Sequence, residues 1–269
     1  MISRLRHAPK YVFLTVFAIF SIFPLYFMAV SATNSSRDVL DSRMIPGLAL
    51  FDNFAKLIVA QDVGSAMWNS LAIAVATTVL ALLVCSIAGY GFEVFHSRAK
   101  DFVMAVLLIA IMIPFAAVMV PLFQVFASAG LVNSLAAVII PAISTPFLIL
   151  LFRQASRSFP YEIIEAARID GVSELGIFAR IYLPTMRSTY SAAAVITFMT
   201  AWNNFLWPKV ILINNDFQTM PMLISNLSAG YVTDYGVLML AVLLASLPTM
   251  IVFLILQRSF ANGITGAIK

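Results

Sequence analysis

Charged residues are scarce in this sequence. They make up 10% of the 269 residues, whereas hydrophobic residues make up 62%. Apolar residues account for roughly 45–50% of an ordinary soluble domain. The mean hydropathy of +0.98 comes from long apolar runs rather than from scattered core residues. The composition therefore excludes a soluble domain and predicts a membrane protein, because a run of about 20 apolar residues can cross the hydrocarbon core as a helix.

Side chains and motifs that could support catalysis or bind a metal or a phosphate are also scarce. The single cysteine, Cys85, excludes an intrachain disulfide framework. Because the two histidines, His7 and His96, lie far apart in the sequence, no metal cluster of standard spacing can be assembled. No glycine is followed by lysine, which excludes a phosphate-binding P-loop. We expect no catalytic residue, no metal, no cofactor and no nucleic-acid partner.

Long apolar runs are what the sequence does contain. Six of them predict membrane helices, over residues 11–33, 67–92, 102–126, 131–152, 190–212 and 237–257. Lys209 is the only formal charge within them. The interpretation is an all-α membrane protein with one transmembrane domain over residues 1–269, in contact with lipid.

Lysine and arginine in the connections predict the orientation of these spans. If the N-terminus is cytoplasmic, 12 of the 16 basic residues lie inside and 4 lie outside. Since short cytoplasmic loops carry the excess of basic residues, both termini are predicted to be cytoplasmic and the protein to be multi-pass in the cytoplasmic (inner) membrane. The same count places residues 153–189, called the charged loop below, in the cytoplasm.

Small residues and prolines mark the spans. Thr77, Ala81, Cys85 and Gly89 recur every four residues, which predicts a stripe for close helix contact and makes Cys85 a packing residue. Seven prolines lie within the spans, and each removes a backbone donor and tends to kink its helix. These kinks either belong to a transport pathway or reflect the general frequency of proline in membrane helices.

The charged loop has the pattern of two short helices joined at a glycine. Ser158 is predicted to cap the first helix, and Gly171 is predicted to end it in a left-handed conformation. Ser173 opens the second helix, which is predicted to run to Tyr182 and to break at Leu183-Pro184. By helix pattern alone, an amphipathic hairpin lying on the lipid surface is an open alternative.

The spacing in the charged loop carries a family resemblance. Glu165-Ala166-Ala167, three residues, Gly171, nine residues and then Ile181-Tyr182-Leu183-Pro184 match the pattern EAA-x3-G-x9-I-x-L-P. The chain resembles the permease subunits of bacterial type I ABC importers, in which this loop is a coupling helix that docks on the ATPase. The resemblance implies that the docking residues here are Glu165, Ala166, Ala167, Arg168, Asp170, Gly171, Ile181, Leu183 and Pro184.

Two further stretches narrow the resemblance. The passage from Ala201 to Pro208 is similar to the fifth-span signature of carbohydrate-uptake permeases, and Gln257-Arg258-Ser259-Phe260 is similar to their usual C-terminus. Six spans fit the smaller permease of maltose-type importers. The resemblance implies a second, non-identical permease, two cytosolic ATPase subunits that bind the ATP, and an extracytoplasmic solute-binding protein.

The function expected from this resemblance is ATP-driven import of a sugar or oligosaccharide, with no enzymatic activity in this chain. Import of a glycerol phosphate or another polyol derivative by the same machinery is the alternative within this class. A stand-alone ion-coupled carrier is a further alternative. It would need coordinating carboxylates at mid-membrane, and the spans contain none.

Two regions are candidates for contact with the solute or its binding protein. In the fifth span, Asn203 and Asn204 offer amides and Trp202 and Trp207 offer ring faces, which predicts a substrate pathway. The alternative is that the amides bond a neighbouring helix and the tryptophans mark the membrane interface. The outer loop 214–236 has an apolar centre, and it either reaches into the binding protein or packs on the permease as a cap.

Overall fold

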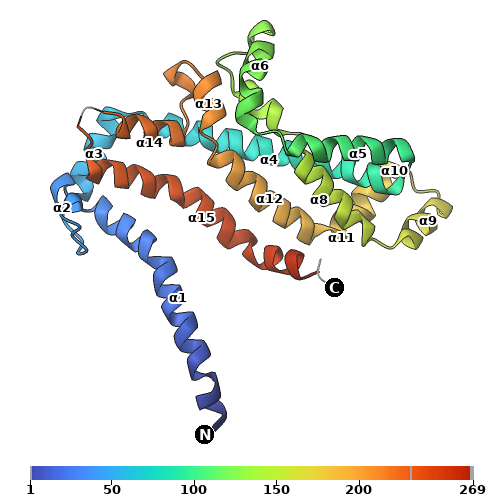
Figure 1. Cartoon of the computed structure of the whole chain (residues 1–269), viewed down its shortest axis with the longest axis horizontal. Coiled ribbons are helices and arrows are strands. Elements are labelled where there is room, and N and C mark those ends of the chain that lie inside the picture. Colours follow the sequence, from blue (N-terminus) through green and yellow to red (C-terminus); the bar gives the residue numbers. More distant parts are fainter. Residues whose placement is uncertain (1, 231, 267–269) are drawn as a thin grey trace. The chain divides into compact units, whose positions relative to one another are not determined.

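The computed structural model describes the backbone of residues 2–230 and 232–266, and the side chains of residues 10–214, 216–230 and 232–257. Within that part every regular element is a helix and no strand occurs, which confirms the predicted all-helical class. Figure 1 shows these helices in sequence colours. The predicted cytoplasmic termini involve Met1 and residues 267–269, which lie outside the described residues.

Three helices are long and apolar enough to cross a membrane. They are α1 (Ile2–Ala32), α4 (Val63–Val94) and α15 (Tyr235–Gly266), with qualifying stretches Lys10–Ala32, Val63–Val94 and Tyr235–Gln257. They coincide with the first, second and sixth predicted spans. A helix of 20 residues is about 30 Å long, so each stretch is long enough to cross a bilayer core.

The third and fourth predicted spans are broken helices. Residues 102–126 fall on α5 (Arg98–Ile111) and α6 (Phe115–Ser128), which are bent by 105°. Pro114 lies between them in an extended conformation, because proline cannot donate the helical hydrogen bond and pushes the preceding residue out of the helix. Residues 131–152 fall on α7 (Leu135–Ile139), η1 (Ile140–Ala142) and α8 (Pro146–Arg157), with a 42° bend.

The fifth predicted span is interrupted as well. It falls on α12 (Arg187–Trp202) and α13 (Leu206–Ile211), separated by Asn203, Asn204 and Phe205. Among the described residues the count of candidate spans is three, or five if each bent pair is one span. The count of six spans therefore stays a prediction. Continuous apolar composition marked the region correctly, but it could not reveal where the helices break.

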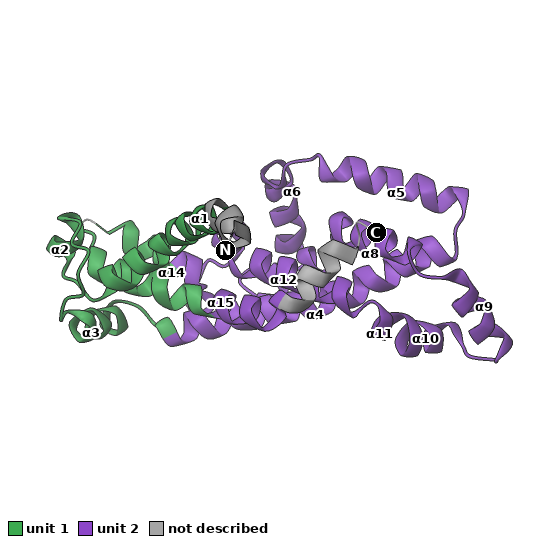
Figure 2. Cartoon of the chain, turned by 90° about the horizontal axis from the view of Figure 1, so that it is seen from below, with its two compact units in different colours: residues 1–63, 223–247 green, residues 64–222, 248–269 purple. Residues whose placement is uncertain are grey.

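Contacts gather the chain into two compact units, coloured separately in Figure 2. The first contains residues 1–63 and 223–247. It includes the short helices α2 (Ser36–Leu40) and α3 (Leu50–Ala60). Two buried amides hold it: Asn34 donates to the carbonyls of Arg43 and Ile45, and Asn53 donates to those of Ala32 and Asn34. Buried amides need such partners, because an unpaired polar group is costly.

The second unit contains residues 64–222 and 248–269. Its helices α4 and α8 approach each other closely at Gly89, where an added Cβ would lie 2.6 Å from Cβ of Phe152 and 2.7 Å from the amide nitrogen of Arg153. Ala81 and Cys85 are fully buried on the same stripe. The predicted small-residue contact and the packing role of Cys85 are therefore confirmed.

Candidate functional site

The first helix of the charged loop is α9 (Tyr161–Ile169), and it begins later than predicted. Pro160 is its N-cap residue, whereas Ser158 ends α8 and donates its hydroxyl to the Ala155 carbonyl at 2.7 Å. The predicted cap at Ser158 is therefore wrong. The chain leaves the helix before Pro160 because the residue that precedes a proline avoids the helical conformation.

Gly171 ends α9 as predicted. Its φ is +78°, its N–H binds the Arg168 carbonyl at 3.0 Å, and the N–H of Val172 binds the Ala167 carbonyl at 3.0 Å. This pair of bonds is the Schellman motif, in which a glycine adopts the left-handed conformation at no steric cost. A Cβ added at Gly171 would meet nothing within 4 Å. The requirement for glycine is thus set by the backbone and not by a neighbouring side chain.

The second part of the loop consists of α10 (Glu174–Ile177), a π-helical turn η2 (Phe178–Tyr182) and α11 (Leu183–Thr185). Ser173 caps α10 as predicted, accepting from the N–H of Gly176 at 3.3 Å. The predicted break at Leu183-Pro184 is wrong, because Pro184 lies in the first turn of α11. Tyr182 and Leu183 are both helical, so α11 continues the π-helical turn without interruption. The turn away from the helix comes at Met186.

Arg168 joins the two helices of the charged loop across the glycine. Its Nε donates to Oε1 of Glu174 at 2.6 Å, and its Nη1 donates to the Tyr161 hydroxyl at 3.1 Å. The hydrogen bond to Glu174 raises the pKa of the Arg168 guanidinium above its usual value. The guanidinium also lies 5.8 Å from the ring centre of Phe95. Arg168 therefore connects α9 to α10 through contacts within this chain.

The inner face of the charged loop packs on the ends of α4 and α8. The hydroxyls of Tyr182 and Ser156 lie 2.7 Å apart, and the ring of Tyr182 lies 4.8 Å from that of Tyr90. Tyr90 also meets Phe178 edge-on at 5.4 Å. Burial raises the pKa of the Tyr182 phenol, so it stays a neutral hydrogen-bonding group at physiological pH. These contacts fix the part of the loop around Phe178 and Tyr182 to α4 and α8.

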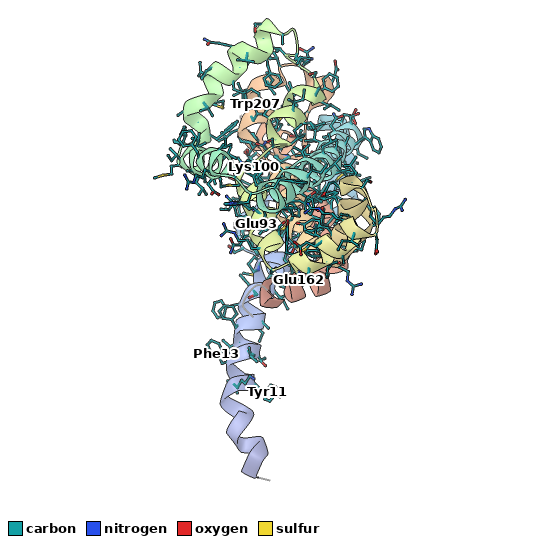
Figure 3. The ribbon with its side chains drawn as sticks, turned by 90° about the vertical axis from the view of Figure 1, so that its right-hand side faces the viewer. Tyr11, Phe13, Glu93, Lys100, Glu162 and Trp207 are labelled. Carbon is teal, nitrogen blue, oxygen red and sulfur yellow. The ribbon has the colours of Figure 1, made fainter. Side chains whose placement is uncertain are left out.

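A cluster of ion pairs lies where α4, α5 and α8 end or begin. The nearly buried Arg153 donates from Nε to Glu93 at 3.1 Å and from Nη2 to Asp101 at 2.6 Å. Arg157 reaches Glu93 at 3.2 Å, and His96 reaches Asp101 at 2.9 Å. In Figure 3, the labelled residues Glu93, Lys100 and Glu162 locate the elements α4, α5 and α9.

Lys100 adds a further contact to this region, because its Nζ binds the carbonyls of Gly91 and Phe95 at 3.0 and 2.5 Å. A cation placed on the last carbonyls of a helix is favourable, since those carbonyls lack intrahelical partners. The end of α4 is therefore held by side chains from both α5 and α8.

The outer face of the charged loop is open. Ile169 is 87% exposed and Leu175 is 75% exposed, on either side of Gly171. The predicted docking residues divide between the two faces. Ala167 is buried against the inner cluster, Arg168 and Ile181 are partly buried, and Glu165, Ala166, Asp170, Gly171, Leu183 and Pro184 are exposed. Exposed apolar side chains beside a carboxylate form a surface suited to a protein partner.

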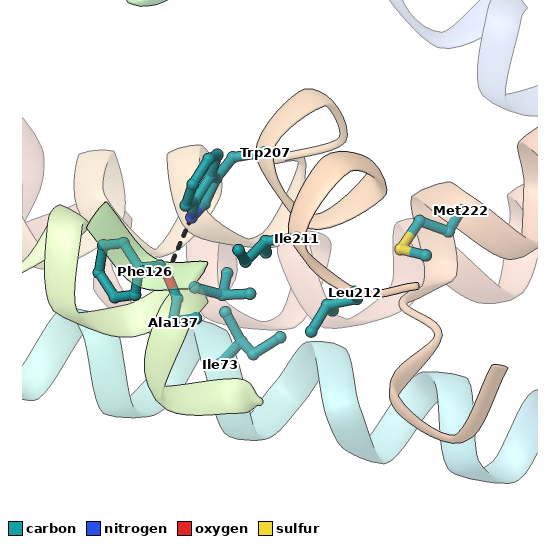
Figure 4. Packing of buried hydrophobic residues seen from close by; sticks show 8 residues of the cluster. Ile73, Phe126, Ala137, Trp207, Ile211, Leu212 and Met222 are labelled. Carbon is teal, nitrogen blue, oxygen red and sulfur yellow. Dashed lines mark hydrogen bonds between the residues drawn. The ribbon is translucent and has the colours of Figure 1, made fainter. Parts of the chain in front are cut away.

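The structure separates the four predicted pathway residues. Trp207 is 2% exposed, donates from Nε1 to the Ala137 carbonyl at 2.9 Å and meets Phe126 edge-on (Figure 4). Phe115 also meets Trp207 edge-on, with ring centres 6.0 Å apart. Trp202 is equally buried and stacks on Phe198 at 5.9 Å. Both tryptophans are core residues here, and the sequence could not indicate this because Ala137 lies 70 residues away from Trp207.

The two asparagines also differ. Asn203 is exposed and turns back to donate to the Met199 carbonyl at 2.8 Å, at the end of its own helix. Asn204 lines a cavity together with Thr77, Thr145 and Thr200. Of the predicted pathway residues, Asn204 is therefore the one that the structure places on a cavity wall.

The outer loop is partly packed on its own chain. Asn69 donates to the carbonyls of Asp216 and Gln218, and the N–H of Met220 donates to the Ser70 hydroxyl at 2.7 Å. The loop continues into α14 (Met220–Ser228), whose far end is exposed at Ser228. The start of α14 is thus packed on α4, whereas residues 228–230 are exposed.

Within the described part of the chain, no three or more histidine, cysteine or acidic residues gather into a group that could hold a metal ion. The arrangement presents a braced docking loop, helices with breaks at proline and asparagine, and an uncharged cavity between helices. Such a site can transmit movement and pass a solute.

A model of the family described as "binding-protein-dependent transport system inner membrane component" matches residues 81–266. The chain belongs to this family. The match covers the charged loop, the ion-pair cluster and the lining of the cavity except Thr77, and the family is one of transport components rather than enzymes.

Relatives span the whole length of this permease. It is 45% identical to the lactose transport system permease of Rhizobium radiobacter over 99% of this chain and 97% of that protein. It is 35% identical to an arabinooligosaccharide transport permease of Halalkalibacterium halodurans, over 94% and 92% of the two chains. It is 31% identical to the sn-glycerol-3-phosphate transport permease of Salmonella typhi, over 92% of each.

A solved structure shares the fold. A chain of a bacterial ABC transporter involved in import of the acidic polysaccharide alginate aligns with a TM-score of 0.83 over 97% of this chain and 98% of that one. At 18% identity this similarity establishes the permease fold alone.

Proposed function

We propose that this permease is one of two non-identical membrane subunits of an ATP-driven type I importer, and that its solute is a sugar or oligosaccharide. The charged loop carries this proposal. Its inner face is tied to α4 and α8 through Tyr182, whereas its outer face exposes Glu165, Ile169 and Leu175. A loop that is rigidly attached on one side and open on the other is suited to receive force from a partner.

The proposed partners follow from that arrangement and from the family. Two cytosolic ATPase subunits dock on the outer faces of the charged loops of the two permeases. A solute-binding protein delivers the sugar on the opposite side of the cytoplasmic membrane. ATP binds and is hydrolysed in the ATPase subunits, and this chain needs no cofactor of its own. Closure of the ATPase pair moves the charged loop, and α4 and α8 move with it because Tyr182 and Arg153 join them.

The proposed topology has six spans and both termini in the cytoplasm. The 12 basic residues assigned to that side support this orientation, since they lie in the connections that it makes cytoplasmic. The charged loop then lies beside the ATPase, and the exposed residues 228–230 face the binding protein.

The sugar assignment rests on two relatives named for lactose and for arabinooligosaccharides. The rival solute is a glycerol phosphate, for which another relative is named. Lys209 is a cation in the fifth predicted span, but it lies outside the lining of the cavity that contains Asn204. The uncharged cavity favours the sugar.

The test is uptake by the assembled importer in proteoliposomes, with both permeases, the ATPase pair and the binding protein present. We expect uptake of radiolabelled lactose or an arabinooligosaccharide that requires both ATP and the binding protein. Uptake driven by an ion gradient without ATP would contradict the importer assignment. ATP-dependent uptake of sn-glycerol 3-phosphate instead of either sugar would contradict the substrate assignment.

A further inference from the structure

A cavity of about 230 Å³ lies within the second unit, between α4, η1, α8 and α12. Its polar residues are four threonines and one asparagine, and Phe147 contributes an aromatic ring; the polar set is Thr77, Thr145, Thr197, Thr200 and Asn204. The remaining lining is aliphatic. The lining residues therefore combine an apolar wall with a few hydroxyl and amide groups, which is the usual composition of a small-molecule site.

Thr77 has an unusual place in this cavity. Its side chain is 2% exposed, yet its Oγ1 has no hydrogen-bond partner among the described residues. Leaving a buried hydroxyl unpaired costs free energy, so such a group in a folded protein calls for an explanation. Its neighbour Thr78 shows the ordinary solution, because its hydroxyl donates to the Ala74 carbonyl at 2.6 Å.

The other threonine hydroxyls keep some bonding capacity. Thr197 donates to the Ala193 carbonyl at 2.7 Å, and Thr200 donates to the Ile196 carbonyl at 2.8 Å. Each oxygen has used its hydrogen and still has lone pairs to accept a hydrogen bond. The amide of Asn204 can donate and accept. Together these groups offer both donors and acceptors to a polyhydroxyl solute.

No ionisable side chain lines the cavity. A phosphate placed there would be buried without a counter-charge, which is far more costly than burying hydroxyls that find partners. A purely apolar occupant would leave the Thr77 hydroxyl unpaired. An uncharged ring that carries hydroxyls at its edge and C–H groups on its faces satisfies both parts of the lining.

We infer that this cavity binds one uncharged sugar or polyol ring during transport, with solute hydroxyls bonded to Thr77 and Asn204 and the ring face against Phe147. The inference rests on the proposed function and deepens it by naming the ligand class and the contacts. The volume is below the roughly 300–1,000 Å³ of pockets for drug-sized ligands, so a longer oligosaccharide places one ring here at a time.

The first experiment removes one hydroxyl at a time from the assembled importer. Thr77→Val keeps the side-chain shape, and Thr78→Val on the next residue of the same helix is the matched control. For lactose uptake we expect Thr77→Val to raise KM by about three- to tenfold, the effect of one lost hydrogen bond. We expect Thr78→Val to leave KM unchanged within about twofold.

Thermal stability separates binding from structure in this experiment. Because Oγ1 of Thr77 lacks a partner, Thr77→Val should not lower the unfolding temperature of the purified importer, and a small rise is expected. A higher KM with undiminished stability supports the solute contact. An unchanged KM for Thr77→Val overturns it, and so does a loss of stability that accompanies the rise in KM.

The second experiment needs no transported solute. It measures the labelling of single introduced cysteines by thiol reagents. Asn204→Cys places a thiol on the cavity wall, and Asn203→Cys places one on the surface. The unchanged chain, whose described cysteine Cys85 is buried, gives the background labelling. We expect Asn203→Cys to react with neutral and anionic thiosulfonate reagents at similar rates. Asn204→Cys should react with the small neutral reagent and about tenfold or more slowly with the anionic one, because the cavity lacks a cation.

The outcomes of the two experiments are distinguishable. Equal reaction of Asn204→Cys with both reagents, or with neither, overturns the cavity as a site for uncharged solutes. Uptake that does not depend on ATP or the binding protein overturns the proposed function, and the labelling still reports on the cavity. ATP-dependent uptake of sn-glycerol 3-phosphate, with a KM that Thr77→Val raises, overturns the assignment of an uncharged ring.

Discussion

The hydroxyl of Ser156 on α8 lies 2.7 Å from the hydroxyl of Tyr182 at the end of η2, in a buried contact that spans 26 residues of the chain. Ser156 also donates to the Phe152 carbonyl at 2.8 Å, so its hydrogen is used within α8 and the phenol of Tyr182 is the donor between them. Residues 161–185 of the charged loop are thereby tied to α8, the helix that carries Arg153.

We expect this bond to affect coupling more than folding. Tyr182→Phe should cost about 1 kcal/mol of stability, because one neutral hydrogen bond is lost and the ring contacts remain. Binding-protein-stimulated ATP hydrolysis should fall in Tyr182→Phe and in Ser156→Ala. The double variant should be no worse than either single variant in a double-mutant cycle. Strictly additive losses would show that the two hydroxyls act independently.

The left-handed turn at Gly171 predicts a graded series. Gly171→Val should destabilise the loop by roughly 1–2 kcal/mol, because a β-branched residue resists positive φ. Gly171→Asn is the control, since asparagine tolerates this conformation better and an added side chain meets no neighbour at this position. We expect Gly171→Val to reach the membrane and to lose transport, and Gly171→Asn to keep most of it. Equal transport by the two variants would argue against a role for the turn geometry.

The next prediction concerns the negative charge that Glu165 places on the proposed docking surface. It is exposed on α9, and its carboxylate forms no ion pair within the described part of the chain. Glu165→Lys should insert normally but retain the ATPase subunits poorly, as measured by their co-purification. The control is Glu162→Lys in the first turn of the same helix, where charge reversal opposes the helix dipole by about 0.3–1 kcal/mol. If Glu162→Lys lowers ATPase retention as much, the effect belongs to helix stability and not to docking.

Arg153 and Arg157 both pair with Glu93, and we expect their replacement to have different effects on stability. Arg153→Met leaves Glu93 and Asp101 without their buried partner and should cost roughly 1–3 kcal/mol, reduced because both acids are partly exposed to water. Arg157→Met should cost less than about 1 kcal/mol, since the Arg157 side chain is 51% exposed. Thermal unfolding of the purified complex measures both. Equal unfolding temperatures would mean that the cluster does not hold the helices together.

Within the outer loop 214–236, we expect the buried and the exposed residues to have different roles. Deletion of residues 228–230 removes exposed backbone and leaves the buried Met220 and Met222 in place. We expect such a variant to assemble normally and to show at least about a twofold weaker stimulation of ATP hydrolysis by the loaded binding protein, in the range of one lost polar contact. Undiminished stimulation would favour a purely structural cap for the whole loop.

Local signals in the sequence were sufficient to predict some features. The turn at Gly171 and the cap at Ser173 depend on residues within one helical turn, and both lie where the pattern places them. The stripe through Ala81, Cys85 and Gly89 is also a local periodicity. Its partner surface on α8 could not be derived, although the need for a close partner could.

Features that depend on distant contacts could not be predicted. The ion pair of Arg153 is one of these features, because nothing local in the sequence shows that it meets Glu93, 60 residues away. The sequence left open whether Trp202 and Trp207 line a pathway or mark the membrane interface, since composition does not reveal that Phe115 and Phe126 flank Trp207. Pro114 is one of the seven prolines expected to kink a span, but the sequence does not give the size of the bend, which is 105°.

Contact between the backbones of α4 and α8 at Gly89 leaves no side-chain layer that could slide or re-pack. We therefore expect α4 and α8 to move together as one rigid body during a transport cycle. Bending within the second unit is therefore expected at its helical breaks, residues 112–114 and 203–205, where a change in backbone angle costs the fewest hydrogen bonds. Asn204 belongs to the second of these breaks, so a change of angle there would also reshape the wall of the cavity.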